Sequence, residues 1–159
     1  MRCITDSEIS EWLRRYKIQK DPYHGEVGPD YYLQFYAPDS HGDLDALTRH
    51  YFDRIISGSV ALVHMTDWAL YKPSEMIAVT GIRSIHGENR WLIEAPGHLI
   101  GPDETELGIS LFALSASFGW TAYLYSPLDS AILLNWEGEI FDYWTDNQQA
   151  LSEMRKSVV

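Results

Sequence analysis

Three apolar, aromatic runs follow one another closely near the end of the chain, and they constrain the fold more than any other feature. The runs are TAYLY at 121–125, AILLNWE at 131–137 and EIFDYW at 139–144. They are separated by SPLDS and by Glu137-Gly138, and both separators have the composition of turns. Short strands joined by such turns predict an antiparallel three-stranded meander.

Upstream of the meander, hydrophobic periodicity predicts helices and strands in turn. Thr5 and Glu8 have the spacing of a capping box and precede apolar residues at helical intervals. Asp43 can cap a second helix, and Thr145 or Asp146 can cap the last one. Besides the meander and the last helix, the expected helices are 5–20, 43–58, 73–87 and 103–119, and the expected strands are 31–37, 59–65 and 90–95.

This order of elements predicts an α+β fold. The strands do not alternate evenly with the helices, which favours an antiparallel or mixed sheet that carries the C-terminal meander and is packed by about five helices. A chain of 159 residues has the size of one domain, and no repeat or linker interrupts it. We therefore expect residues 1–159 to form a single domain.

The acidic side chains are concentrated in one part of the chain. The formal net charge is −11, and residues 91–154 contain ten Asp and Glu but neither Lys nor Arg. The first 90 residues contain thirteen acids and ten bases. Such a field repels nucleic acid and anionic lipid and attracts a basic partner, although acidity also favours solubility in general. We expect no nucleic-acid partner and no membrane partner.

The N-terminal composition indicates a cytoplasmic protein. Cys3 is the only cysteine, which leaves no internal disulfide and no thiolate zinc site, and this fits a reducing compartment. Five charged side chains lie between positions 8 and 17, where a signal peptide or membrane span would be apolar. We expect neither of these segments.

No sequence motif indicates a catalytic residue, a cofactor or a metal, and we expect none of the three. The six histidines lie in separate segments, and the chain has neither a G-x-S-x-G elbow nor a glycine-rich phosphate loop. The alternative is a small hydrolase or ligand-binding enzyme. In that case His64 and Asp67, three positions apart at the end of a strand, would form an acid-base site in a cleft near His98.

The hairpin at 135–146, NWEGEIFDYWTD, combines acids with large aromatic residues. A two-residue turn at Glu137-Gly138 would pair Trp136 with Glu139 and Leu133 with Asp142, which spreads the carboxylates around the turn and over both faces. A catalytic pair would need them to converge. Both faces also carry large apolar groups, so the hairpin is either covered on both sides or covered on one side by a partner.

The helix ELGISLFALSASF, followed by GWTAYLYSPLDSAILLNWEGEIFDYWTDN, resembles the C-terminal part of the small immunity proteins encoded beside bacterial polymorphic toxins. The likeness is mainly in residues 107–147 and is a pattern of aromatic and acidic residues. It implies a non-enzymatic protein that binds and blocks a cognate toxin domain acting in the cytoplasm. Contact-dependent, type VI and Rhs-type systems deliver such toxins.

The resemblance and the charge distribution together indicate that the meander and the turn after it form a partner-binding surface. Large aromatic residues dominate the energetics of many protein interfaces, and charges at their rim speed association. The predicted charged contacts are Glu137, Glu139, Asp142 and Asp146. The predicted apolar contacts are Trp136, Tyr143 and Trp144, with the alternative that Trp136 and Trp144 belong to the core.

Overall fold

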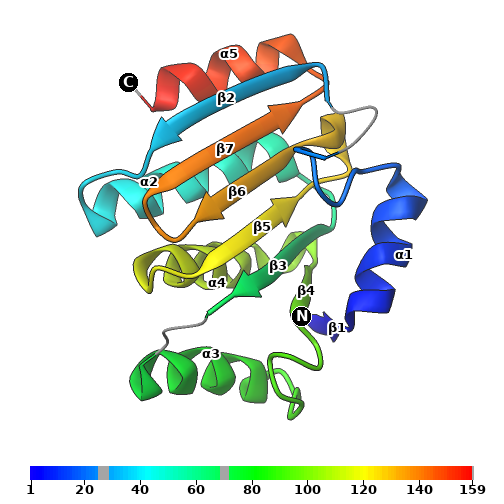
Figure 1. Cartoon of the computed structure of the whole chain (residues 1–159), viewed down its shortest axis with the longest axis vertical. Helices are drawn as coiled ribbons and strands as arrows, with labels where there is room; N and C mark the ends of the chain where they lie inside the picture. The colour runs from blue at the N-terminus through cyan, green and yellow to red at the C-terminus, as the bar shows by residue number, and fades with distance from the viewer. Residues whose placement is uncertain (25–28, 69–71, 159) are drawn as a thin grey trace.

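A single antiparallel sheet organises the chain, and helices pack on it (Figure 1). The computed structural model describes residues 1–24, 29–68 and 72–158, with the backbone alone at position 55. Over these residues the strands are β1 (Arg2–Ile4), β2 (Tyr31–Tyr36), β3 (Ala61–Asp67), β4 (Gly97–Ile100), β5 (Thr121–Tyr125), β6 (Ile132–Trp136) and β7 (Ile140–Thr145). The α-helices are α1 (Asp6–Tyr16), α2 (His41–Tyr51), α3 (Pro73–Ile85), α4 (Thr105–Ser117) and α5 (Gln148–Ser157). Shorter turns are the π-helix η1 (Phe52–Ile56) and the 3₁₀-helices η2 (Pro102–Glu104) and η3 (Leu128–Ser130).

The strands lie in the order β1-β4-β3-β5-β6-β7-β2, and each neighbouring pair is antiparallel. Figure 1 shows α2 and α4 behind the sheet, α1 at its right-hand side and α5 along β2. The last three strands before α5 form the meander β5-β6-β7. This α+β arrangement of helices on an antiparallel sheet confirms the fold class that the sequence predicts.

Different elements cover the two faces of the sheet. The back face packs against α2 and α4 in a large apolar cluster that includes Tyr51, Phe112 and Phe141. The opposite side, which we call the front face, packs against α1 in a smaller cluster that includes Ile9 and Leu134. The meander is therefore covered by the chain's own residues on both faces, one of the two arrangements that its sequence allows.

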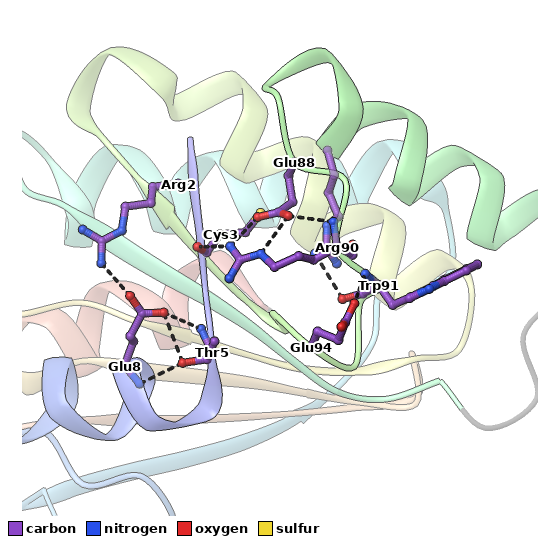
Figure 2. Close-up of polar contacts among 9 residues, drawn as sticks. Arg2, Cys3, Thr5, Glu8, Glu88, Arg90, Trp91 and Glu94 are labelled. Carbon is purple, nitrogen blue, oxygen red and sulfur yellow. Dashed lines mark hydrogen bonds and ion pairs between the residues drawn. The ribbon is translucent and has the colours of Figure 1, made fainter.

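The first helix begins as predicted. The Thr5 hydroxyl accepts the Glu8 N–H at 3.3 Å, and the Glu8 carboxylate accepts the Thr5 N–H at 2.8 Å, which completes the capping box (Figure 2). The three residues before it form β1, which pairs with β4 and is absent from the predicted elements. A three-residue strand is too short to show a hydrophobic period in the sequence.

The predicted strand at 90–95 is wrong, because this segment folds into a local turn. The Glu94 carboxylate accepts the Trp91 N–H at 2.8 Å, and the Glu94 N–H returns to the Trp91 carbonyl at 3.0 Å. Arg90 is held by Glu88 and donates to the Cys3 carbonyl at 3.0 Å (Figure 2). These local bonds satisfy the backbone without a neighbouring strand, and the sheet resumes only at β4.

Two later helices have other caps than those predicted. Ser40 caps α2, and its hydroxyl accepts the N–H of Asp43, which lies inside the helix. Asn147 caps α5, where Thr145 and Asp146 are the predicted caps. In both cases a short polar side chain lies within a few positions of the predicted one, and the sequence cannot rank such neighbours.

The pairing of β6 with β7 is displaced by one residue from the predicted register. Trp136 pairs with Ile140 instead of Glu139, because the connection has three residues, 137–139, instead of two. The displacement moves Asp142 to the same face as Trp136, since side chains alternate along a strand. Both residues therefore belong to the front face.

Close backbone contacts fix the position of the loop at 137–139. Gly138 has φ 73°, and a Cβ atom there would overlap the Ala116 carbonyl oxygen at the end of α4. The buried Asn135 side chain also holds the loop. Its Nδ2 donates to the Trp120 carbonyl at 2.8 Å, and its Oδ1 accepts a hydrogen bond from the Gly138 N–H at 2.9 Å. The loop is thus held against α4 although its acidic side chains are exposed.

Replacing Gly138 by alanine should lower the free energy of unfolding by about 2 kcal/mol or more, because Cβ would be placed at positive φ and against a backbone oxygen. Gly81→Ala is the matched control. Apart from its chain neighbours and the backbone of its own helix, no described atom lies within 4 Å of its Cβ position, so a gain of about 0.5–1 kcal/mol is expected. Urea denaturation would measure both changes. Equal stability of the two variants would contradict this account of the loop.

Candidate functional site

Some of the predicted partner-binding residues are exposed around the end of the hairpin. Trp136 is 49% exposed, and Glu137 and Glu139 are exposed on the loop beside it. Asp146 is also exposed, but it follows β7 at the other end of the strand, roughly 20 Å from Glu139. Asp146 is therefore separated from the two acids of the hairpin loop.

Tyr143 and Trp144 are core residues. This corrects the predicted role of Tyr143 as a contact for a partner, and for Trp144 it agrees with the alternative that the residue belongs to the core. Tyr143 is fully buried on the back face, where its ring meets Tyr51 edge-on at 5.9 Å. Trp144 is 5% exposed on the front face, and its ring lies 5.0 Å from Tyr23 and 5.4 Å from Tyr32. Successive residues of β7 thus supply one aromatic ring to each core.

Asp142 is buried as well, with 1% of its surface exposed, so it is not the surface charge that the sequence predicts. Its Oδ1 accepts hydrogen bonds from the Tyr32 hydroxyl at 2.6 Å and from Gln34 Nε2 at 2.9 Å. Its Oδ2 accepts a hydrogen bond from the Tyr23 hydroxyl. A carboxylate is thus held on the front face by three neutral donors, which offset the cost of burying it.

Both tyrosine hydroxyls keep their protons for this network. The pKa of Tyr32 is raised to about 12 and the pKa of Tyr23 is raised far above its usual value. Burial is the larger cause for both, and the hydrogen bond to Asp142 is the second. Burial also raises the pKa of Tyr123, and the negative charges of Asp21 and Asp142 add to this effect. Two carboxylates therefore act electrostatically on this part of the front face.

A pocket of about 560 Å³ opens beside the network, and we call it the front-face pocket. Its lining combines aromatic rings and carboxylates with no Lys or Arg among the described residues. The lining residues are Asp21, Tyr23, His24, Gln34, Tyr123, Trp136, Ile140 and Asp142. Trp136 and Ile140 flank the hairpin loop, so the loop that carries the exposed Glu137 and Glu139 continues directly from the pocket lining, although neither acid lines the pocket.

The aromatic walls of the pocket are held by their neighbours. The Tyr23 ring stands nearly perpendicular to the Trp136 ring, with the centroids 6.5 Å apart. Tyr123 stacks on Tyr125 at 5.4 Å, and the Tyr125 hydroxyl donates to the Lys20 carbonyl at 2.7 Å. The segment after α1 is thereby tied to the front face, where it brings Asp21 and Tyr23 to the pocket.

Among the lining residues, only Trp136 and Asp142 are predicted as site residues from the sequence. Asp21 and Tyr23 follow α1, Gln34 lies on β2 and Tyr123 lies on β5. The alternation in YYLQFY indicates that Tyr32 and Gln34 share a face. No local pattern, however, indicates that this face meets a carboxylate 108 residues later.

The two histidines of the alternative hydrolase site are buried on neighbouring strands. His64 is 5% exposed, and its Nε2 lies 3.6 Å from the carboxylate of Asp6, whereas the predicted partner Asp67 is exposed at the end of β3. His98 is fully buried, with Nδ1 3.2 Å from the Val63 carbonyl. Neither histidine lines the front-face pocket, and the hydrolase remains an untested prediction.

Over residues 1–24, 29–68 and 72–158, no three His, Cys, Asp or Glu side chains gather in an arrangement that could hold a metal ion. Within the same ranges, no helix has both the length and the apolar character needed to cross a membrane. Comparisons with protein-family models, curated proteins and solved structures gave no match to this chain. The case for a function therefore depends on the geometry of the front face.

Tyr32→Phe should lower the free energy of unfolding by about 1–2 kcal/mol, because it leaves the buried Asp142 carboxylate with one donor fewer. Tyr36→Phe is the matched control, since Tyr36 lies on the same strand and is 84% exposed. Its effect should stay within about 0.5 kcal/mol. Chemical denaturation at pH 7 compares the two, and similar losses would argue against the Asp142 network.

Stability should fall as the pH is lowered below about 6.5. Burial lowers the pKa of His64 to about 4 and of His98 to about 3, and the positive charges of Lys20 and Arg83 respectively add to this. Both side chains titrate near 6.5 in an unfolded chain. The unfolded chain therefore binds more protons between these values, and acid favours unfolding by up to about 1.4 kcal/mol per pH unit for each histidine.

His64→Gln should make this pH dependence shallower between about pH 6.5 and 4.5, because it removes a side chain whose pKa is lower in the folded than in the unfolded chain. His86→Gln provides the control, since His86 is exposed. Urea unfolding at half-unit pH steps measures the slopes. An unaltered slope in the His64 variant would show that His64 does not titrate in this way.

Proposed function

We propose that this protein is an immunity protein, which binds a bacterial toxin domain and blocks its activity. The observation that carries the proposal is the exposed acidic loop of the hairpin, Glu137 and Glu139, beside an aromatic pocket with two further carboxylates. The resemblance of residues 107–147 to immunity proteins supports the same function. No catalysis by this chain is required.

The partner surface is revised by the burial of three predicted residues. Trp136, Glu137 and Glu139 stay in the proposed surface because they are exposed, and the rim of the front-face pocket joins them. Trp144 supports the surface from within the front core through its contacts with Tyr23 and Tyr32, whereas Tyr143 belongs to the core of the back face. Asp146 lies at the far end of β7, outside a small interface centred on the hairpin loop. It would lie at the edge of a larger interface with the toxin domain.

Electrostatics provides the mechanism of inhibition. Residues 91–154 contain ten acids and no Lys or Arg, and this field attracts a basic surface and speeds its association. Toxins that act on nucleic acids or nucleotides bind phosphates through basic clefts, so an acidic loop competes for the same charges. A cytoplasmic location, where such substrates occur, is part of the proposal.

Charge reversal in the loop should slow association with the toxin domain encoded beside the gene. The double variant Glu137→Lys and Glu139→Lys should lower the association rate constant about tenfold at low salt and weaken its salt dependence. The dissociation rate should change less, because the charges lie at the surface. Stopped-flow or biosensor kinetics at several salt concentrations measure these effects.

The matched control is Asp53→Lys with Asp103→Lys, two exposed acids in η1 and η2. Both double variants change the formal net charge of −11 by the same amount, so only the position of the charge differs. Protection of cells that express the toxin should be lost in the loop variant and kept in the control. A folded loop variant that protects as well as the control would refute the proposed surface.

A further inference from the structure

We infer that the front-face pocket receives an arginine side chain from the protein partner. The inference deepens the proposed function, on which it rests for the source of that side chain. Its physical basis is independent of the hairpin loop. It lies in the aromatic walls, the two carboxylates and the volume of the open pocket.

The charge of the pocket selects a cation. The Asp142 carboxylate is 1% exposed and receives hydrogen bonds from neutral donors, so its charge is not cancelled by the residues that bind it. Asp21 lies at the rim with about half of its side chain exposed, and its Oδ2 is 2.7 Å from Nδ1 of His24, which also lines the pocket. A buried negative charge in a low-dielectric wall acts strongly on a ligand that displaces water from the pocket.

The aromatic rings select a weakly hydrated, planar cation. Trp136 and Tyr23 stand nearly perpendicular and form a corner, and Tyr123 adds a third ring to the lining. A guanidinium stacks on such rings and is less strongly hydrated than an ammonium. Asp142 is 1% exposed and three of its about four acceptor positions are already used, so the cation is held mainly by ring faces and by charge, which suits arginine better than lysine.

The size and position of the pocket fit a side chain presented by a protein. Its volume of about 560 Å³ lies within the usual range for ligand pockets. Trp136 and Ile140 connect it directly to the exposed hairpin loop. A partner drawn to Glu137 and Glu139 would thus find the pocket next to its first contact.

The test uses N-acetyl-arginine N-methylamide as the probe and the citrulline analogue as its neutral isostere. Titration of the ¹⁵N-labelled protein should shift the indole N–H signal of Trp136, which is identified by its loss in Trp136→Phe. We expect a dissociation constant in the millimolar range for the arginine compound and binding at least about tenfold weaker for citrulline. Equal shifts with the two compounds would overturn the inference.

Variants locate the binding site. Trp136→Ala should lower the affinity for the arginine compound at least about fivefold, as followed by the amide signals of Gln34 and Ile140. Trp91→Ala should leave this affinity unchanged. Trp91 is the control because it is 70% exposed and lies outside the pocket lining. Asp21→Asn should also weaken binding while it keeps an acceptor for the Tyr23 N–H. Unchanged binding in the Trp136 variant would overturn the proposed site.

Further probes separate the ligand classes. The lysine analogue should bind more weakly than the arginine compound. Free L-arginine should bind no more tightly, because the acidic loop repels its α-carboxylate and attracts its α-ammonium, and the two effects offset each other. Tighter binding of either would overturn the assignment to a protein-borne arginine. If the arginine compound fails to bind but the toxin still binds through the loop, the pocket inference alone is wrong. If the compound binds and no toxin is bound, the immunity function alone is wrong.

Discussion

Burial of β6 and β7 on both faces is the constraint on which the rest of this structure depends. These strands carry large side chains on each side, so the chain must provide two covering layers. The layer of α2 and α4 covers the back. The front is covered by α1 and the short segment after it, and Trp136 at the end of β6 remains half exposed. The candidate site lies where this front layer ends.

The segment after α1 reaches the front face through two hydroxyl groups, and this has an electrostatic consequence. Tyr125 binds the Lys20 carbonyl, and Tyr23 binds the Asp142 carboxylate. The second bond keeps a negative charge buried with neutral partners instead of a lysine or arginine. The charge remains available to a cation from outside, because hydrogen bonds stabilise a carboxylate without removing its field. The negative field of residues 91–154 and the buried charge of Asp142 therefore both favour a positively charged partner.

Much of the fold could be predicted because its signals are local. The capping box of Thr5 and Glu8, the turns of the meander and the spacing of apolar residues act within a few positions. The errors arose where a second local interaction competed. The Glu94 side chain turns residues 91–94 away from a strand. In the hairpin, Glu137 and Gly138 have the left-handed φ angles of a two-residue turn and the Glu139 N–H donates to the Trp136 carbonyl, but Glu139 is an extra residue before the ladder resumes at Ile140. Neither effect changes the hydrophobic pattern from which strands are predicted.

The sequence by itself determined that the chain has an antiparallel meander, an α+β fold and an acidic, aromatic hairpin. Only the tertiary structure decided which hairpin residues are exposed. A displacement of one residue moves a side chain to the other face, so Asp142 joins Trp136 on the front while Tyr143 enters the back core. The partners of Asp142 come from positions 23, 32 and 34, more than 100 residues away. Contacts over such separations arise from the packing of the whole sheet, and local sequence patterns do not encode them.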